Sequence, residues 1–571
     1  FINSSNIDFT VTDLTIDQSE DIDEESLFSG SSYQDYTNLQ NISVYLSNIQ
    51  IQDYVVYALG STLSSCTNIQ KLKLDIFYNG FGSQGLTALG SALSNLKDLQ
   101  KISFLFYEIY FEFLGAQALG SGISKCCQLR ELSLSFYFTF ISDEGTIALS
   151  SKFSNLTNLQ SLYFSSQNQI DAKSIQALSS AILAINLSHL SLMLEGNKFG
   201  DDGVIALGSS ISTIKLTSLS LNLSYNKITD EGALSLISIL SRSLTLSTFI
   251  FFIYEEVSEE NFLLLVSSLK ACTNLKSLML YFSCFNFGDK CVSTLVSCLP
   301  NLVGIQTLEI NLISNEICDK GVEDLSLCLP KCINLQKLHF EIQQESIGFE
   351  GTSALATALS NCTKLSHLYV SLYQNNITNE GALSLTSILS SNLTLLALML
   401  YMNEEIDEKS LLLLGSSLKT CTNLQSLRLQ LSQSQISDEG TIALTSAFSN
   451  LTNLETFNFS SIYNHISTKG ASALGAALSN CIKLQTLYIT FEKNDIRDQG
   501  VQAISVCLPK CIDLRNNLTD EGAISLTSIL SSNLTLLNLM LIIESQQIDQ
   551  QTETYIKFKI LKFRRLVNIQ V

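Results

Sequence analysis

A repeat of 28 to 30 residues runs through almost the whole chain and constrains its fold more than any other feature. Each unit opens with alternating apolar residues, the period-two pattern of a strand, and continues with apolar residues at helical spacing. The residues that open the alternation are, in order, Leu14, Ile42, Leu72, Ile102, Leu132, Leu162, Leu190, Leu219, Phe249, Leu278, Leu308, Leu338, Leu368, Leu398, Leu427, Phe457, Leu487 and Leu539. One unit cannot cover its own apolar face, so neighbours must stack into a continuous core. The spacing predicts an α/β solenoid of about eighteen strand-bearing units without a domain break.

A second signature marks the start of each helix. It reads Ile-Ser-Asp-Glu-Gly at 141–145 and 436–440, and Ile-Thr-Asp-Glu-Gly at 228–232. Ser142 and Thr229 stand where an N-cap is expected, and the acidic pair falls in the first helical turn, where the helix dipole favours negative charge. A calcium loop would need oxygen ligands at alternating positions closed by a distant Glu. We therefore interpret the acidic pairs as parts of helix starts and expect no metal there.

Two stretches connect the repeat with a known family. They are Leu187-Ser-His-Leu-Ser-Leu-Met-Leu-Glu-Gly-Asn197 and Leu216-Thr-Ser-Leu-Ser-Leu-Asn-Leu-Ser-Tyr-Asn226. With them the chain resembles the leucine-rich-repeat family, in particular the long-unit subclass typified by ribonuclease inhibitor. The resemblance implies a curved, right-handed α/β solenoid, a horseshoe with parallel strands on the concave face, helices on the convex face, and a partner held on the concave face or rims. The asparagine arrives about two residues later than in the family pattern, so strand length and turn geometry remain open.

The repeat array is expected to span residues 1–550 and to begin inside a unit, so the chain looks like a fragment of something longer. Residues 228–280 and 377–429 align with an offset of 149, which indicates a duplicated block of five units. A third copy lacks eight residues near Arg515, which predicts a strandless unit at 512–533. That gap is either a real deletion or an error in the assembled coding sequence. Residues 551–571 are expected to be a basic C-terminal tail or cap; residues 555–571 could alternatively be a membrane-surface or nucleic-acid segment, or an artefact.

Composition limits the partners of the chain. The 53 acidic residues against 33 Lys and Arg give a net charge of −20, which disfavours binding to nucleic acid and anionic membranes. No apolar run approaches the ~18 residues of a membrane helix, and no signal peptide opens the chain. We expect a soluble, cytoplasmic monomer.

Most of the fifteen cysteines follow the repeat. Eight share one position just before the next strand: Cys66, Cys126, Cys272, Cys332, Cys362, Cys421, Cys481 and Cys511. Small thiols at one register position are typical of a buried ladder, and an odd total without a secretion signal favours reduced cysteines. The Cys-Leu-Pro-Lys-Cys segments lack partner histidines for zinc.

The sequence shows no catalytic constellation. The four histidines, His189, His339, His367 and His465, fall on different units and lie in no recognised nucleophile motif. There is no glycine-rich phosphate loop, and paired carboxylates occur only at helix starts. We therefore expect no enzymatic activity, no cofactor and no metal in this chain.

The remaining functional feature is the strand surface. In an alternating strand the apolar residues point into the core, so the residues between them face the concave side. In the middle units several of these residues are aromatic or long and apolar, a clustering typical of a binding surface, although β-propensity alone also places Tyr on strands. The predicted protein-binding residues are Ile250, Phe252, Tyr254, Met279, Tyr281, Tyr369, Tyr373, Met399 and Tyr401.

These observations predict a non-catalytic protein–protein interaction scaffold that binds a protein ligand on its concave face. Two alternatives stay open. One is a GTPase-activating protein resembling the leucine-rich-repeat activator of Ran, although that family carries an acidic tail and this tail is basic. The other is the sensing array of a larger kinase or nucleotide-binding receptor whose catalytic part precedes Phe1. The sequence does not identify the protein ligand.

Overall fold

The computed structural model describes residues 13–18, 39–47, 53–77, 82–109, 112–139, 141–254, 257–283, 288–343, 345–391, 394–402, 407–505, 539–542 and 567–570. Its contacts group the chain into two compact units that divide between Tyr281 and Phe282. In both units strands alternate with helices along the chain, as the repeat predicts. The extent of the array, 1–550, stays a prediction.

The first unit is built from the elements up to Tyr281, with β10 lying at the division. Its strands are β1 (Asp13–Gln18), β2 (Asn41–Ser47), β3 (Lys71–Phe77), β4 (Lys101–Tyr107), β5 (Glu131–Tyr137), β6 (Ser161–Gln167), β7 (His189–Met193), β8 (Ser218–Asn222), β9 (Thr248–Ile253) and β10 (Ser277–Ser283). Its helices are α1 (Asp53–Ser65), α2 (Ser83–Leu93), α3 (Phe113–Ile123), α4 (Asp143–Ser150), α5 (Ala172–Leu183), α6 (Gly200–Ile211), α7 (Asp230–Arg242) and α8 (Glu259–Ser268), with the short 3₁₀ helices η3 (Phe153–Asn155) and η4 (Leu269–Ala271).

The second unit repeats the same alternation. Its strands are β11 (Thr307–Ile313), β12 (Lys337–Glu341), β13 (His367–Ser371), β14 (Ala397–Met402), β15 (Ser426–Leu431), β16 (Thr456–Ser460), β17 (Thr486–Thr490), β18 (Leu539–Ile542) and β19 (Val567–Gln570). Its helices are α9 (Gly288–Cys298), α10 (Asp319–Cys328), α11 (Phe349–Ser360), α12 (Asn379–Ser391), α13 (Glu408–Leu418), α14 (Asp438–Thr445), α15 (Thr468–Leu478) and α16 (Arg497–Ser505), with η5 (Leu299–Asn301) and η6 (Leu329–Lys331).

Neighbouring strands are parallel, and their register follows the repeat. Each of the eighteen residues expected to open a strand lies in one of β1–β18. In the first unit Leu132 pairs with Leu162 and Leu190 with Leu219; in the second Leu338 pairs with Leu368. The parallel strands that the family resemblance implies are confirmed.

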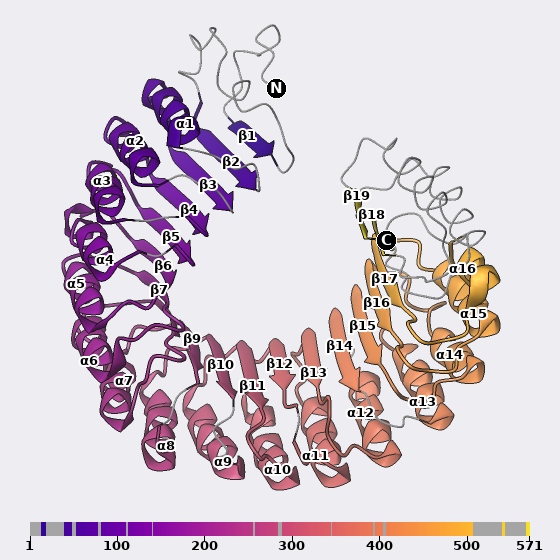
Figure 1. Cartoon of the computed structure of the whole chain (residues 1–571). Helices are drawn as coiled ribbons and strands as arrows, with labels where there is room; N and C mark the ends of the chain where they lie inside the picture. The colour runs from indigo at the N-terminus through magenta and orange to yellow at the C-terminus, as the bar shows by residue number, and fades with distance from the viewer. Residues whose placement is uncertain are drawn as a thin grey trace, which may run out of the picture. The chain divides into compact units, whose positions relative to one another are not determined.

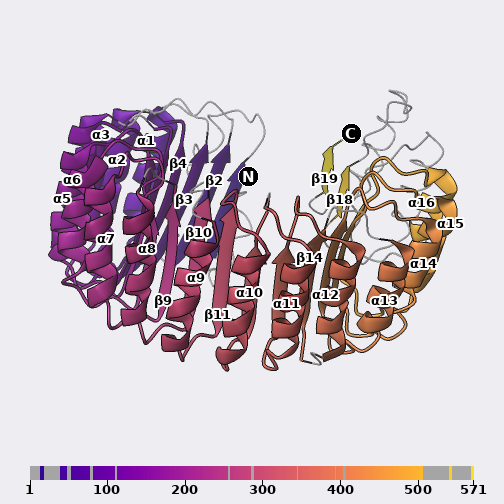
Figure 2. The ribbon, with the colours of Figure 1, turned by 90° about the horizontal axis from the view of Figure 1, so that it is seen from below.

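Each unit has one bare strand face and one face covered by helices. Figure 1 shows that within each unit the helices lie on a single side of the strands and that the row of strands curves toward the other side. Figure 2 shows the helices of each unit side by side in one layer. We call the helix-free strand face of a unit its inner face. Alternate strand residues point away from it and are buried, as Leu308, Ile310 and Leu312 of β11 are.

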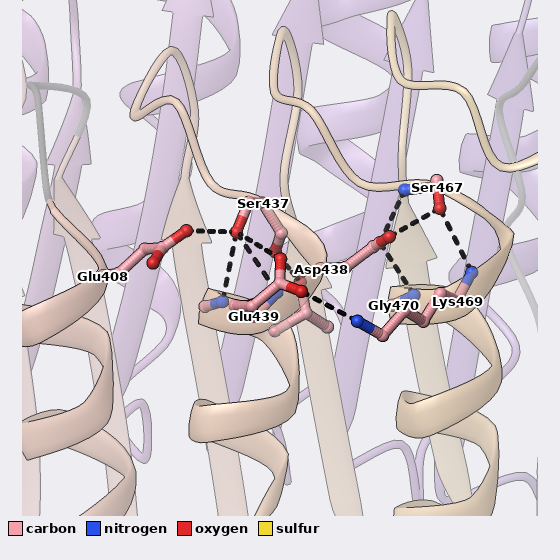
Figure 3. Close-up of polar contacts among 9 residues, drawn as sticks. Glu408, Ser437, Asp438, Glu439, Ser467, Lys469 and Gly470 are labelled. Atoms are coloured by element: carbon pink, nitrogen blue, oxygen red, sulfur yellow. Dashed lines mark hydrogen bonds and ion pairs between the residues drawn. The ribbon is translucent and has the colours of Figure 1, made fainter.

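Hydrogen bonds from one repeat unit to the next join the helix starts. Ser142 is an N-cap as predicted and accepts from Gly145 N at 3.1 Å. The first acidic residue of the helix, however, mostly reaches the following unit. Asp438 accepts from the backbone nitrogens of Ser467 and Gly470, both at 2.8 Å, and from Ser467 Oγ at 2.6 Å (Figure 3). A backbone nitrogen of the following repeat unit likewise donates to Asp53, Asp201, Asp289 and Asp319.

This arrangement explains the glycine near the start of two helices, Gly470 and Gly232. A Cβ built on Gly470 would stand 2.6 Å from Asp438 Oδ1, and one on Gly232 would stand 2.5 Å from Asp201 Oδ1. The glycine therefore leaves space for the carboxylate of the preceding repeat unit, which accepts hydrogen bonds from backbone nitrogens at the start of the helix. The acidic residue serves inter-unit packing as well as its own helix dipole.

Buried asparagines that follow the strands form a second row of contacts between neighbouring repeat units. Asn464 Oδ1 accepts from Ser434 N and Ile436 N at 3.0 and 2.9 Å, and its Nδ2 donates to Leu431 O at 2.8 Å. Buried residues placed in the same way are Asn197, Asn226, Asn315 and Asn375, and the partly exposed Asn494 makes the matching bond. The asparagine that arrives late in the sequence pattern thus still satisfies backbone groups of the preceding unit.

One repeat unit carries a carboxylate in place of this asparagine. Glu345 is 8% exposed and accepts from Asn315 N and from Ile317 N, the latter at 2.8 Å. Burial, which outweighs these hydrogen bonds, raises the pKa of Glu345. A glutamate therefore accepts the same backbone donors but cannot donate as the asparagine amide does unless it is protonated.

Several predictions fall on other parts of the chain. The strandless unit at 512–533 and the basic residues of 555–565 lie outside the described residues. Close to the C-terminus, β18 pairs in parallel with β19. Among the described residues, no helix combines the length and the apolar character needed to cross a bilayer.

Candidate binding surface on the inner face

The nine residues predicted to bind protein lie on or beside the strands of both units. Ile250 and Phe252 lie on β9, Met279 and Tyr281 on β10, Tyr369 on β13, and Met399 and Tyr401 on β14. Tyr254 and Tyr373 lie just beyond the ends of β9 and β13 instead of on the strands. All nine are partly exposed, and those on strands alternate with buried residues. The burial of the seven strand residues agrees with the two-residue alternation, and the role of all nine in binding stays a prediction.

In the first unit two aromatic pairs form. The rings of Phe252 and Tyr281 stack with centroids 4.0 Å apart and an interplanar angle of 9°. Beyond the strand ends, Tyr254 stacks on Tyr225 at 5.8 Å, and Tyr225 is 61% exposed. Each ring covers part of its neighbour, so these aromatic side chains are held in fixed positions while one edge remains accessible.

In the second unit a longer stack crosses three strands. His339 on β12 lies opposite Tyr369 on β13, and their ring centroids are 3.8 Å apart. Tyr369 in turn lies 5.2 Å from the ring of Tyr401 on β14. The parallel register places these residues on one surface, because outward positions of neighbouring strands face the same side.

The stack continues onto a fourth strand through Arg428, which the sequence analysis did not single out. Arg428 lies on β15 opposite Met399, and its Cζ is 5.3 Å from the centroid of the Tyr401 ring. This distance is typical of a cation–π contact. Its outward position between the buried Leu427 and Leu429 could have identified it, because the alternation assigns it to the inner face.

Two carboxylates lie at the other end of the stack. His339 Nδ1 is 3.1 Å from Glu309 Oε1, and His339 Nε2 is 3.7 Å from Glu341 Oε2. Glu341 also accepts from Asn311 Nδ2 at 2.6 Å and from Gln343 Nε2. The inner face of the second unit is therefore acidic at β11–β12, aromatic at β12–β14 and basic at β15.

The tyrosine hydroxyls of this stack stay protonated. Burial, and after it the negative charge of Glu341, raises the pKa of Tyr369 to about 12. Burial also raises the pKa of Tyr401, although the nearby Arg428 opposes that effect. Both side chains therefore present neutral rings at physiological pH.

The first unit has a further aromatic row that the sequence analysis missed. Phe77 and Tyr107 are 6.3 Å apart at the ends of β3 and β4, and Tyr107 makes an edge contact with Phe138 at 5.5 Å. Strands β2–β6 have seven residues, so the alternation reaches Phe77 and Tyr107 at the ends of β3 and β4. Following the alternation to the ends of these strands would have found Phe77 and Tyr107, whereas Phe138 follows the last residue of β5 and falls outside it.

Metal binding and thiol chemistry depend on two features of the described part of the chain. Among the described residues, no three His, Cys, Asp or Glu side chains come together in a way that would hold a metal ion. Seven of the eight ladder cysteines are described, and all seven are buried. Burial raises the pKa of the Cys126 and Cys362 thiols to about 12, which disfavours the thiolate needed for nucleophilic chemistry.

Comparison with known proteins agrees with the fold. Residues 68–90, 186–208 and 216–236 match the family model described as Leucine Rich repeat. These matches, together with the parallel strands and alternating helices, fit a leucine-rich-repeat protein. The ribonuclease-inhibitor-like subclass stays a prediction.

The similarity of this chain to individual proteins is low. No curated protein matches the chain. Among the solved structures that match is the crystal structure of the Rad7 and Elc1 complex in yeast. The matched chain is 14% identical, the alignment covers 88% of this chain and 86% of that chain, and the TM-score is 0.36.

Proposed function

We propose that this chain is a non-catalytic protein-interaction scaffold that holds a protein ligand on the inner face, with the His339–Tyr369–Tyr401–Arg428 stack as its main contact. That stack is the observation that carries the proposal. The rings are partly exposed and held in place by their neighbours, so little side-chain freedom is lost on binding. Tyrosine and arginine are also among the residues enriched at the positions that contribute most to binding energy in protein interfaces.

The test uses peptides selected from a random display library on the whole chain. Their affinity is then measured for the variant Tyr369→Ser/Tyr401→Ser and for the control Tyr57→Ser/Tyr463→Ser. The control removes two tyrosines that are 68% and 55% exposed on α1 and on a loop. We expect the inner-face variant to bind at least ~30-fold more weakly, equivalent to ~2 kcal/mol, and the control to bind normally.

The same measurement on Tyr281→Ser examines the stack of the first unit. Thermal unfolding of every variant checks that the fold is intact, as expected for residues outside the core. Unchanged affinity for the Tyr369→Ser/Tyr401→Ser variant would contradict the proposal and move the binding surface to the loops or helices.

A further inference from the structure

We propose that the inner face of the second unit binds an acidic side chain of the protein ligand, whose carboxylate pairs with the guanidinium of Arg428. This inference rests on the proposed function, because it names the chemical group of the ligand that meets the basic end of the stack.

Arg428 has no anionic partner within the described part of the chain. Its guanidinium lies 5.3 Å from the centroid of the Tyr401 ring, and the residue is partly exposed. Among the described residues its side chain makes no hydrogen bond and no ion pair. A guanidinium keeps its charge and its planar fork of N–H donors at physiological pH. These donors therefore point to a group that a ligand would supply.

Two amide side chains stand beside this guanidinium. Asn458 lies opposite Arg428 on β16, and Gln430 follows on β15, opposite Tyr401. Both residues are partly exposed, and within the described chain neither side chain forms a hydrogen bond. The strands β14, β15 and β16 lie side by side (Figure 1), so outward side chains on them share one surface. Arg428, Gln430 and Asn458 thus form a group of available N–H donors, which we call the donor cluster.

The first unit contains the same arrangement with its anion included. Lys73 lies 4.7 Å from the centroid of the Tyr45 ring and forms an ion pair with Asp75 at 2.9 Å. The register is the same in both units: Asp75 lies opposite Tyr45, as Gln430 lies opposite Tyr401. In each case the cation stands two residues before, on the same strand. An amide in the second unit therefore occupies the position at which the first unit has a carboxylate.

This difference determines the chemistry of the ligand. The amide of Gln430 is neutral and leaves the charge of Arg428 without compensation. The carboxylates of Glu309 and Glu341 lie on β11 and β12, beyond the aromatic stack. A ligand carboxylate would match the planar guanidinium with two parallel hydrogen bonds. A basic group would be repelled there, and an apolar group would leave the donor cluster unpaired.

The experiment uses the full chain and a random peptide display library at physiological salt. The net charge of −20 disfavours acidic peptides in general, so a preference for them must come from a local site. We expect Asp or Glu in the selected peptides. Synthetic copies with blocked termini are then compared, by fluorescence anisotropy, with copies in which each acidic residue is replaced in turn by its amide. One such replacement should weaken binding about tenfold.

Variants of the chain locate the site. Arg428→Gln should weaken the acidic peptide about tenfold and hardly affect the amide peptide, which a double-mutant cycle measures. Arg242→Gln removes an equal charge at the exposed end of α7 and should have little effect. Gln430→Glu introduces a carboxylate where the first unit has Asp75, so it should also weaken the acidic peptide about tenfold. Thermal unfolding of each variant checks that the fold is intact.

Equal binding of the acidic and amide peptides, additive effects in the cycle, equal effects of Arg428→Gln and Arg242→Gln, or unchanged binding to Gln430→Glu would overturn the inference. These outcomes differ from failure of the proposed function. Selected peptides that depend on Tyr369 and Tyr401 but contain no acidic residue would leave the scaffold proposal standing and refute the carboxylate site. Peptides that do not depend on those tyrosines, or a selection that yields no binding peptide, would refute both.

Discussion

Asp438 Oδ1 lies 2.8 Å from the backbone nitrogen of Gly470 in the next repeat unit, and a Cβ on Gly470 would stand 2.6 Å from the same oxygen. The two residues are therefore interdependent. The aspartate needs a glycine opposite it, and the helix that starts at Thr468 receives a cap from the preceding unit.

The first prediction concerns this pair. Gly470→Ala should lower the free energy of unfolding by about 1–3 kcal/mol, because the new methyl group displaces the Asp438 carboxylate from two backbone donors. Urea unfolding of the full chain followed by circular dichroism measures the loss. In the Asp438→Ala background the same substitution should cost clearly less, since the displaced carboxylate is already absent. Additive effects of the two substitutions would contradict the inter-unit cap.

The second prediction is acid sensitivity from the same carboxylate. Burial alone would raise the pKa of Asp438, but hydrogen bonds from Ser467 and Gly470 outweigh it and hold the pKa below its usual value. A lowered folded-state pKa stabilises the protein above the unfolded pKa of about 3.9, and this stability is lost as the pH falls through the folded pKa. When melting temperatures are measured between pH 2 and 7, they should decrease once the pH is lower than about 4. The fall should be smaller in Asp438→Asn; equal profiles would speak against this role.

The third prediction concerns the buried carboxylate of Glu345, whose pKa is raised by burial. A raised folded-state pKa contributes stability that is complete below the unfolded pKa of about 4.3 and is lost as the pH rises through the folded pKa. Glu345→Gln removes this dependence and adds an amide donor. The melting temperature of the variant should therefore exceed that of the wild type by a margin that grows from about pH 4.5 upward.

The converse substitution provides the control. Asn375 holds the equivalent position, with Ile347 N donating to its Oδ1 at 3.2 Å and its Nδ2 donating to Ile342 O at 2.8 Å. Asn375→Asp should destabilise the protein, and more strongly at pH 7 than at pH 4. A Glu345→Gln margin that does not change with pH would refute the assignment.

The fourth prediction uses two adjacent cysteines. Cys126 is buried and burial raises its pKa to about 12, whereas Cys127 is exposed. Brief alkylation of the native protein by iodoacetamide, read by mass spectrometry, should label Cys127 at least ~100-fold faster than Cys126. Cys318 is also exposed, but a hydrogen bond to Asp289 raises its pKa, so it should react more slowly than Cys127. Equal labelling of Cys126 and Cys127 would show that the cysteine ladder is open to solvent.

Local sequence patterns were sufficient to place the strands and the inner-face residues. The alternation around Leu338, Leu368 and Leu398 sets which side chains are buried, because successive strand residues point to opposite faces. The two-residue period by itself therefore assigns Tyr369, Met399 and Tyr401 to the outward side. The limit of this reasoning appears where a strand ends: Tyr373 continues the alternation but lies beyond Ser371, the last residue of β13.

Contacts between repeat units were decided only by the tertiary structure. The sequence indicates that Asp438 stands in the first turn of a helix, but its bond to Gly470 spans 32 residues. In the same way, the position of Arg428 over Tyr401 and the substitution of Glu345 for a buried asparagine depend on how one unit is stacked on the next. Burial and orientation within a strand follow from a two-residue period, whereas distances between side chains of different units follow from the register and curvature of the stacked strands, which no single repeat contains.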